Sequence, residues 1–392
     1  MDARKRVKGP QVRLGVIGVG GMGAGHCSTM HKVPEVRLTA VCDISESTAK
    51  TIGKKYSVPC FTSHQELIRS KLCDAVLIAT PHPVRPDIAI DAMNARLHVL
   101  SEKPLSERVL TADKMVKTAG RKGVALAVMF QRRMEPPFAK AIELVKSGAI
   151  GTVWRTTMIS PEYRTQAYYD SGNWRATWSG EGGGVMMNQS PHVLDLFVQL
   201  GGMPSEVTGR CETRLHKIEV EDVAEAMLRY PGGGTGYFYC STNELGPGQM
   251  IEIFGTHGKL CYRDKQLKYY RFSESVPEFT FNTKAVWSSP ECKEEMLDIP
   301  ATEWGHYSII QNFCRHLLHG DRLVSPGEEG LQSLELANAV WLSAHLGKPV
   351  KLPLNRRAYE KFLAGKRAES TFVKAAAPDQ RVTDPSHIAP PQ

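Results

Sequence analysis

The sequence has 392 residues, of which 42% are hydrophobic and 23% are charged, and its formal net charge is +8. This balance is typical of globular proteins, and the length suits two domains, since one domain commonly takes about 100–200 residues. No apolar run approaches the roughly 18–20 residues that span a bilayer, so we expect no membrane-spanning segment.

The ends of the chain and its cysteines indicate a cytoplasmic protein. The basic stretch MDARKRVKGP is not followed by an apolar core, so we expect no secretory signal. The nine cysteines are scattered without a CxxC pair, which predicts reduced thiols and neither a disulfide framework nor a zinc site. Basic residues near both ends are not interleaved with aromatic residues on a recognisable nucleic-acid module, so we expect no nucleic-acid partner.

From Val12 to about Phe130, short apolar runs alternate with amphipathic segments. The runs are rich in Val, Leu and Ile, as expected of strands buried on both faces, and begin at Val12, Val36, Asp74, Leu97 and Val124. Helical segments are predicted over residues 46–55, 85–94 and 106–121. This alternation predicts a parallel, doubly wound α/β domain over residues 12–130, preceded by a flexible basic arm over residues 1–11.

The first predicted strand leads into a glycine motif that opens a helix, Gly18-Val19-Gly20-Gly21-Met22-Gly23. Glycines there allow a tight turn, the close approach of a pyrophosphate and close helix–strand packing, while the helix N-terminus offers N–H groups to phosphates. An acidic residue, Asp43, ends the second strand, where it would accept from both ribose hydroxyls and repel a 2′-phosphate. The motif predicts NAD, with NADP less favoured, bound by Gly18, Gly20, Gly21, Met22, Gly23 and Asp43.

Two later strand ends carry polar loops. Thr80, Pro81 and His82 follow the strand that begins at Asp74, and Glu102 and Lys103 follow the strand that begins at Leu97. Because ligands of an open α/β sheet bind at the carboxyl ends of its strands, we expect all five residues to contact the cofactor. A lysine beside the nicotinamide is also suited to remove a hydroxyl proton as hydride leaves the carbon.

After Glu135 the pattern changes. A helix is predicted over residues 136–147, and helices return over residues 303–319 and 327–346. Between them lie strand-like runs separated by turn motifs such as PGGG and GTHG: VWRTTMI, EVTGRCET, VAEAMLRY, GTGYFYC, MIEIFG and KLCYRD. We predict a second α/β domain over residues 131–364, with an antiparallel or mixed sheet and helices on one face. The Lys-, Ala- and Pro-containing end predicts a flexible tail over residues 365–392.

Several motifs, in this order, resemble the glucose–fructose oxidoreductase / inositol dehydrogenase (Gfo/Idh/MocA) family: GVIGVGGMG, the ATPH loop, SEKPLS and GGGVMMNQSPHVLDL. The stretch GEEGLQSLELANAVWLSAHLGKPVKLPL is similar to the family's C-terminal pattern, so the resemblance covers residues 12–355. It implies a Rossmann domain followed by an α/β domain with a large open sheet, which commonly forms the contact in a homodimer or homotetramer. By the same resemblance, Lys103 is the catalytic lysine.

The segment Asn188-Gln189-Ser190-Pro191-His192 places two polar side chains four residues apart, so on one helix both would face the same pocket. The family often has Asp and His at this spacing, acting with the lysine, whereas this chain has Asn at the first position. An amide cannot relay a proton, so Asn188 would orient a hydroxyl or the lysine, and Lys103 and His192 would handle protons. Within the resemblance, this asparagine is typical of a branch that acts on sugars and glycosides, including levoglucosan-like compounds.

Residues 161–178 combine tyrosines and tryptophans with arginines. Aromatic faces and planar polar groups bind sugars, so we expect this region to bind a carbohydrate, although its aromatic residues could instead only pack a domain interface. Arginines there would also suit an anionic substituent on the sugar. The expected substrate contacts beyond Lys103, Asn188 and His192 are Arg133, Tyr163, Arg164 and Tyr168, and the further cofactor contacts are Gln131, Trp174 and Arg175.

Together the motifs predict an oxidoreductase that moves a hydride between NAD and a ring carbinol, at C3 of a sugar, glycoside or cyclic polyol, without a metal. One alternative is an NAD-dependent glycoside hydrolase. In that reaction transient C3 oxidation acidifies the C2 proton, and elimination, water addition and re-reduction follow with recycled NAD. It needs a base near C2, for which Tyr163 and His192 are candidates. A second alternative is a non-catalytic NAD-binding sensor.

Overall fold

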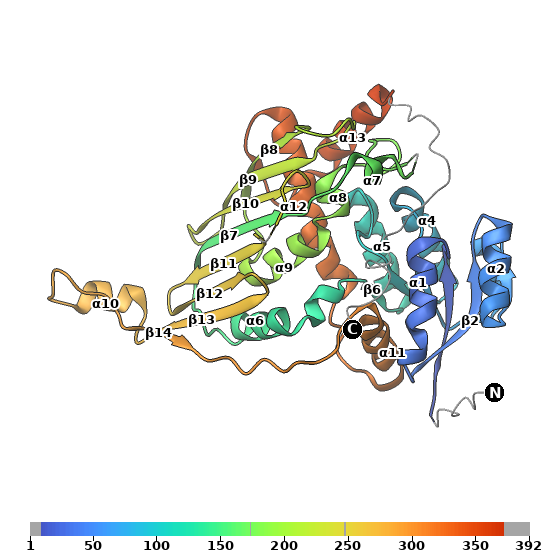
Figure 1. Cartoon of the computed structure of the whole chain (residues 1–392), viewed down its shortest axis with the longest axis horizontal. Coiled ribbons are helices and arrows are strands. Elements are labelled where there is room, and N and C mark those ends of the chain that lie inside the picture. The colour runs from blue at the N-terminus through green and yellow to red at the C-terminus, as the bar shows by residue number, and fades with distance from the viewer. Residues whose placement is uncertain (1–8, 173, 247, 372–392) are drawn as a thin grey trace. The chain divides into compact units, whose positions relative to one another are not determined.

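The computed structural model describes residues 9–172, 174–246 and 248–371 (Figure 1). The chain divides into two compact units. Unit 1 takes its described residues from Met1–Met134 and Trp304–Leu331, and unit 2 takes its own from Glu135–Glu303 and Gln332–Arg381. Residues 1–8 of the predicted arm and residues 372–392 of the predicted tail lie outside the described residues.

Unit 1 contains a parallel six-stranded sheet with the strand order β3-β2-β1-β4-β5-β6. This order confirms the predicted doubly wound sheet. The two residues of β3 form no apolar run, so the sequence did not indicate that strand. The strands are β1 (Val12–Ile17), β2 (Val36–Cys42), β3 (Cys60–Phe61), β4 (Ala75–Ile78), β5 (His98–Ser101) and β6 (Leu126–Val128).

One helix of unit 1 shows ordinary capping at both of its ends. In α2 (Glu46–Tyr56), the Ser45 side chain accepts a hydrogen bond from the Thr48 N–H, and Ser57 closes the helix with a positive φ of 56°. The other helical segments are α1 (Gly21–Thr29), α3 (His64–Arg69), α4 (Arg85–Asn94), α5 (Val109–Lys122) and α11 (His306–His319), with 3₁₀ turns η1 (Met30–Lys32), η2 (His82–Val84) and η3 (Gln131–Met134).

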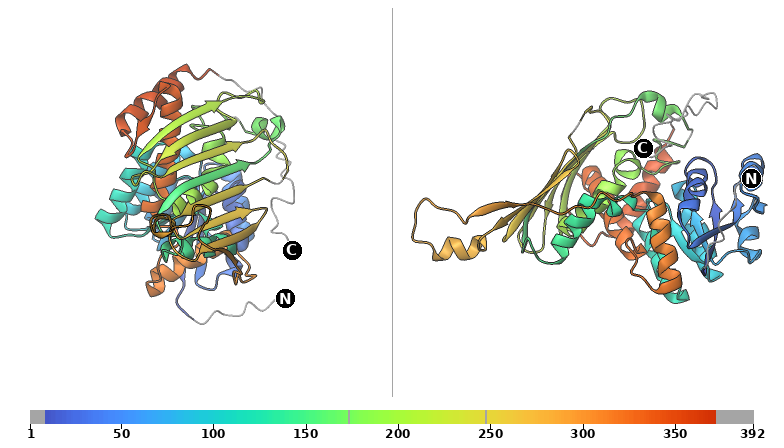
Figure 2. Two further views of the ribbon diagram at one scale, coloured as in Figure 1. Left: turned by 90° about the vertical axis from the view of Figure 1, so that its left-hand side faces the viewer. Right: turned by 60° about the horizontal axis from the view of Figure 1, so that its bottom comes forward.

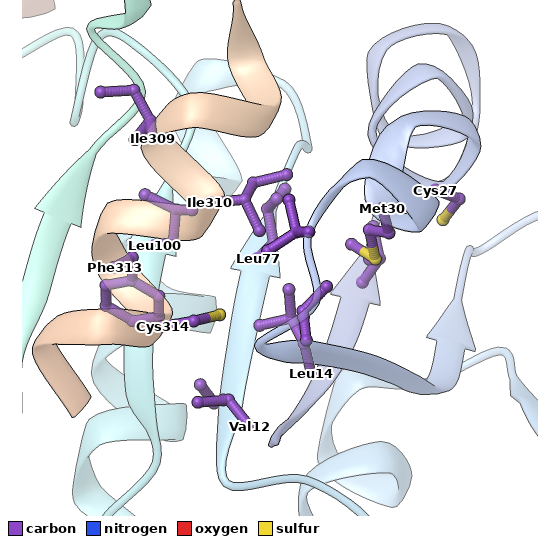
Figure 3. Close-up of a cluster of buried hydrophobic side chains, with 14 of the residues drawn as sticks. Val12, Leu14, Cys27, Met30, Leu77, Leu100, Ile309, Ile310, Phe313 and Cys314 are labelled. Atoms are coloured by element: carbon purple, nitrogen blue, oxygen red, sulfur yellow. The ribbon is translucent and has the colours of Figure 1, made fainter. Parts of the chain in front are cut away.

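Helix α11 lies in unit 1, although the sequence placed residues 303–319 in the second domain. Its buried residues Ile309, Ile310 and Phe313 pack into one core with Leu14 and Leu77 of the parallel sheet (Figure 3). The spacing of these apolar residues predicts one buried helix face. It does not specify which sheet covers that face. The prediction of one continuous second domain over residues 131–364 is therefore wrong for α11, which belongs to unit 1.

Unit 2 contains a nine-stranded sheet with the order β14-β13-β12-β11-β7-β10-β9-β8-β15. Its pairings are antiparallel except between β7 and β10, which confirms a mostly antiparallel sheet. The short or strongly polar strands β13, β14 and β15 were not predicted. The strands are β7 (Val153–Pro161), β8 (Glu206–Glu212), β9 (Val223–Arg229), β10 (Thr235–Ser241), β11 (Met250–Gly255), β12 (Gly258–Arg263), β13 (Gln266–Phe272), β14 (Cys292–Glu295) and β15 (Val350–Lys351).

One face of the large sheet carries helices (Figure 2). In β10 the inward residues Gly236, Phe238 and Cys240 are buried, while Tyr237 and Tyr239 alternate with them and are only partly buried. No helix of the described residues covers that second face. The unit's helices are α6 (Pro136–Lys146), α7 (Gln166–Asp170), α8 (Val185–Asn188), α9 (Pro191–Gly201), α10 (Val276–Asn282), α13 (Arg356–Glu369) and the larger part of α12 (Gly327–Leu346), which starts in unit 1.

Helix α13 continues beyond residue 364, so the prediction of a flexible tail is wrong for residues 365–369. Asn355 caps its N-terminus by accepting from the Ala358 N–H. Its buried Phe362 packs edge-on against Trp178, with ring centroids 5.7 Å apart. The outer side of this helix is charged, as a flexible tail would be. Only its buried apolar residues distinguish the helix from such a tail. In the described parts of the chain, no helix is long and apolar enough to cross a membrane.

Candidate functional site

The glycine loop between β1 and α1 has room only for glycines at two positions. Gly18 has a φ of +86°, and a Cβ there would come within 2.9 Å of the Ala79 carbonyl. A Cβ on Gly23 would lie 1.9 Å from the Gly18 oxygen. Gly20, Gly21 and Met22 are exposed at the start of α1, where the first N–H groups of a helix have no partner within the helix.

Asp43 places a carboxylate beside this loop. One oxygen accepts a hydrogen bond from the Val19 N–H and the other from the Ser45 N–H, both at 3.0 Å. A carboxylate offers about four acceptor positions, so both oxygens can still receive ribose hydroxyls. At the end of β4, the Thr80 hydroxyl oxygen is buried and has no hydrogen-bond partner among the described residues. The glycine cradle, the fixed carboxylate and this hydroxyl fit a dinucleotide.

The other expected cofactor contacts of unit 1 lie at the same strand ends. Pro81 is exposed after β4, His82 is buried at the start of η2, and Gln131 is half-buried at the start of η3 after β6. Arg133 has a different setting from the one expected of a substrate contact. It is buried, pairs with Glu329 and donates to the Val324 carbonyl at 2.8 Å, so it ties η3 to another part of unit 1.

The Glu102-Lys103 segment directly follows β5 and is held by hydrogen bonds. Glu102 is buried; one carboxylate oxygen lies 2.7 Å from His26 Nε2, and the other accepts the Lys103 N–H at 3.0 Å. Burial opposes ionisation of Glu102, but the hydrogen bond and charge of His26 outweigh it and hold the pKa of this carboxyl well below its usual range. Lys103 itself is half-buried.

A buried arginine joins the two strand-end loops. Arg85 begins α4 and donates to the Thr80 carbonyl at 2.6 Å, to the Glu102 carbonyl at 3.0 Å and to the Pro104 carbonyl. Burial lowers the pKa of Arg85 to about 10, so it stays charged at neutral pH. Sequence reasoning missed this residue, and the only indication was an arginine before the apolar stretch of α4.

A second histidine lies against His26. The rings of His26 and His306 meet edge-on, with centroids 5.2 Å apart. Burial lowers the pKa of His306 to about 4, so this ring is neutral at pH 7. His306 comes from α11, far along the chain, and was also missed.

In unit 2, Asn188 and His192 belong to two helices, because α8 ends at Asn188 and α9 starts at Pro191. The predicted single helix is therefore wrong. A proline has no N–H and suits the first position of a new helix, which explains the break. His192 lies in the first turn of α9 and is half-buried, as is Asn188.

Two buried carboxylates hold α8. Glu181 accepts a hydrogen bond from Asn188 Nδ2 through one oxygen and from the Ala176 N–H, at 2.6 Å, through the other. Glu221 accepts from the N–H groups of Gly184, at 3.0 Å, and Met186, at 3.2 Å. Burial raises the pKa of Glu221 to about 7. Neither glutamate was predicted as part of the site, because each contacts α8 only after folding brings their segments together.

The aromatic region forms a stacked cluster around Tyr168 of α7. The Arg175 guanidinium lies 4.3 Å from the Tyr168 ring centroid and 4.7 Å from that of Trp174, and Arg164 lies 5.2 Å from the Tyr168 ring. The Tyr168 hydroxyl oxygen accepts from Arg175 Nη1 at 2.5 Å and from Gln189 Nε2 at 2.8 Å. The structure thus brings together four of the predicted contacts, Arg164, Tyr168, Trp174 and Arg175, and adds Gln189.

The loop that carries Arg164 is anchored from behind. His216 lies 2.8 Å from the Arg164 carbonyl through Nε2 and 3.0 Å from buried Asp222 through Nδ1. Tyr163, one residue earlier, is 42% exposed. Within the described residues, no group of three or more His, Cys, Asp or Glu side chains is arranged to hold a metal ion.

The fold and these contacts define the class: a Rossmann-type dinucleotide-binding unit followed by an α/β unit with an open, mostly antiparallel sheet. Residues 12–130 match the oxidoreductase family with an NAD-binding Rossmann fold, and residues 138–261 match the GFO/IDH/MocA C-terminal domain. The chain belongs to the Gfo/Idh/MocA oxidoreductase family. It is an NAD-dependent oxidoreductase of the sugar and polyol dehydrogenase type.

Known relatives extend over most of the chain. Myo-inositol 2-dehydrogenase of Thermotoga maritima is 25% identical over 350 residues, which cover 87% of this chain and 98% of that enzyme. The WlbA dehydrogenase from Bordetella pertussis, solved in complex with NADH and UDP-GlcNAcA, is 26% identical with a TM-score of 0.75, covering 88% of this chain and 100% of that one. Levoglucosan dehydrogenase in complex with NADH and levoglucosan, at 21% identity, a TM-score of 0.73 and coverage of 88% and 100%, shares the fold.

Proposed function

We propose that this enzyme oxidises a ring carbinol, at C3 of a sugar, glycoside or cyclic polyol, with Lys103 and His192 as the acid–base groups. The main support is the Glu102-Lys103 segment, whose backbone is held at the end of β5 by Glu102 and by Arg85. A base must be kept within hydrogen-bond reach of its proton, and a fixed backbone limits where the lysine side chain can reach.

When bound, NAD supplies the hydride acceptor. The glycine loop and Asp43 hold its diphosphate and ribose, with Thr80, Pro81, His82, Glu102, Gln131, Trp174 and Arg175 as further proposed contacts. Lys103 removes the proton of the reacting hydroxyl, His192 takes or returns a proton near it, and Asn188 binds a hydroxyl. Each of these roles is part of the proposal.

We further propose an anionic or strongly hydroxylated sugar as substrate. Arg175 and Arg164 stack on Tyr168, which combines positive charge with an aromatic face, although Arg164 also pairs with Glu162. Such a cluster suits a carboxylate or phosphate beside a sugar ring. The similar WlbA dehydrogenase was solved with UDP-GlcNAcA, an anionic sugar nucleotide, which supports the same class of ligand. The exposed Tyr163 is a further proposed contact.

The test follows absorbance at 340 nm with NAD and a panel of sugars, uronates, inositols and aryl glycosides, with aglycone release measured in parallel. We expect steady NADH formation with at least one uronate or neutral sugar. Aglycone release without net NADH would instead indicate the redox hydrolase. Silence in both assays, with NAD binding retained, would contradict catalysis and favour a sensor.

We also propose that the enzyme forms a homodimer or homotetramer through the open face of the unit 2 sheet. That face carries Met227, 60% exposed, with Tyr237 and Tyr239 beside it, and the rings of Phe254 and Phe272 lie 5.7 Å apart. The same face carries the ion pairs of Glu252 with Arg155 and Lys259, and exposed apolar side chains bordered by charged ones are typical of a protein–protein contact. Light scattering should give a multiple of 43.4 kDa for the wild type and a smaller species for Met227→Lys.

The segment around α10 adds to this surface. Phe281, Val286, Trp287 and Met296 are each more than 80% exposed, and the segment projects from the edge of the sheet in Figure 1. We propose that it contacts a second copy.

A cytoplasmic location is also proposed, supported by nine cysteines that are all unpaired.

A further inference from the structure

We infer that Glu181 is a positioning residue that makes Asn188 a hydrogen-bond acceptor toward the substrate; this inference rests on the proposed role of Asn188 in binding a hydroxyl. Glu181 is 1% exposed and lies outside the residues that the sequence motifs pointed to. Its two carboxylate oxygens are both used, one by the Asn188 side chain and one by the Ala176 backbone.

The orientation of the Asn188 amide follows from the chemistry of its partner. Both Glu181 oxygens act as acceptors, Oε2 from the Ala176 N–H and Oε1 from Asn188 Nδ2, so the NH₂ end of the Asn188 amide faces Glu181. The Asn188 oxygen Oδ1 is then on the other arm of the amide and directed away from Glu181. A ring hydroxyl that meets Asn188 there donates its proton to Oδ1.

The neighbouring amide is arranged in the same way. Gln189 Nε2 donates to the Tyr168 hydroxyl oxygen at 2.8 Å, and Gln189 Oε1 is buried without a hydrogen-bond partner among the described residues. Gln189 is only 7% exposed, so this acceptor is shielded from bulk solvent. Two consecutive amides thus have their donors held by the protein.

Glu181 also connects Asn188 to the aromatic cluster. Ala176, whose N–H it accepts, directly follows Arg175 and has a φ of +55°. That conformation is unfavourable for a residue with a Cβ and needs support from its surroundings. One carboxylate therefore fixes both the end of α8 and the backbone next to Arg175, so the acceptor and the proposed sugar-binding cluster keep their spacing.

Three variants test the inference as a cycle. In Glu181→Gln, the Ala176 N–H donates to the oxygen of the introduced amide. The NH₂ group of that amide then faces Asn188, so the Asn188 amide must rotate to present its oxygen to it. In Asn188→Asp, two carboxylates meet in a buried place. In the double variant, the amide introduced at position 181 donates its NH₂ group to the carboxylate introduced at position 188, which again offers an oxygen to the substrate.

We expect each single substitution to lower kcat/KM by about 10- to 100-fold, and the double variant to recover to within about threefold of the wild type. Glu219→Gln is the matched control, because Glu219 anchors the same loop at the Trp178 N–H, 2.8 Å away, but bonds Ser370 instead of Asn188. Combined with Asn188→Asp, it should give no recovery. Equal losses in the double variant and in this control combination would overturn the inference.

A stability cycle needs no substrate and separates this inference from the proposed function. Relative to the double variant, Asn188→Asp should lose thermal stability as the pH rises above about 4, because a carboxyl kept neutral by a neighbouring charge resists ionisation. If the losses of the single variants simply add, the Glu181–Asn188 contact is absent. Recovery of stability without recovery of kcat/KM would contradict the positioning role. A wild type silent with every sugar, but with an intact stability cycle, would contradict the proposed function alone.

Discussion

The strand-end loops of unit 1 are held by a buried cation, whereas the α8 segment of unit 2 is held by buried carboxylates. Arg85 donates to three carbonyl groups of the loops after β4 and β5. Glu181 and Glu221 accept N–H groups around α8. The difference follows from the backbone itself, since the loops present carbonyl groups and the start of a helix presents N–H groups. Glu102 in unit 1 follows the same rule, because its carboxylate accepts the Lys103 N–H, so each buried charge has the sign that the backbone groups beside it require.

The largest expected effect is on kcat, and it distinguishes proton transfer by Lys103 of unit 1 from the orientation of a hydroxyl by Asn188 of unit 2. Lys103→Met should lower kcat by about 10²- to 10⁴-fold, because it removes the general base. Asn188→Ala should lower it by about 10- to 100-fold, since only hydrogen bonds are lost. Stopped-flow measurement of NADH formation at 340 nm gives both values. Equal losses would mean that the two regions contribute alike, and the thermal unfolding temperature of each variant provides the control for folding.

Removing the cation of unit 1 comes next. Arg85→Met should destabilise the protein by about 3–5 kcal/mol, because it leaves the Thr80 and Pro104 carbonyl groups without their donor, while the Glu102 carbonyl keeps only its bond from Ser101 Oγ. Arg121→Met is the matched control, since Arg121 lies exposed on the neighbouring α5 and should change stability by less than about 0.5 kcal/mol. Urea unfolding gives the free energies. A loss for Arg85→Met no larger than the control's would show that the loops are held by other contacts.

The carboxylates of unit 2 should appear as a pH dependence. The pKa of Glu221 is raised from 4.5 to about 7 in the folded protein, so its protonated form is favoured there. Wild-type stability should therefore fall as the pH rises from about 4 to 8, by about 3 kcal/mol from this group. Glu221→Gln should lack that part of the slope, whatever its stability at low pH. Parallel pH curves for the two proteins would contradict the raised pKa.

The smallest effect tests the glycine helix of unit 1. A Cβ on Gly25 would meet nothing within 4 Å, so Gly25→Ala should stabilise α1 by about 0.5–1 kcal/mol. The same substitution at Gly23, two residues earlier, should destabilise the protein and weaken NAD binding, because its Cβ would strike the Gly18 oxygen. Thermal unfolding with and without NAD distinguishes them. Equal behaviour of the two variants would mean that helix and strand pack less closely than described.

The two regions also differ in how well the sequence predicted them. The glycine loop, Asp43 and the Lys103 segment each follow a strand that local apolar patterns mark, and the structure places them at those strand ends. In unit 2 the sequence pointed to Asn188 and His192 but predicted one helix where Pro191 begins a second. Strands such as β13, with the sequence QLKYYRF, are too polar for their pattern to predict burial.

By itself the sequence determined the strand–helix alternation of the first domain, the glycine motif and most strands of the second sheet, because these depend on residues close together in the chain. Only the tertiary structure decided that α11 covers the first sheet, that Arg85 spans two loops and that Glu181 meets Asn188. These contacts join loops and helices whose partners are set by packing and charge compensation in three dimensions. No local pattern of residues records such a choice of partner.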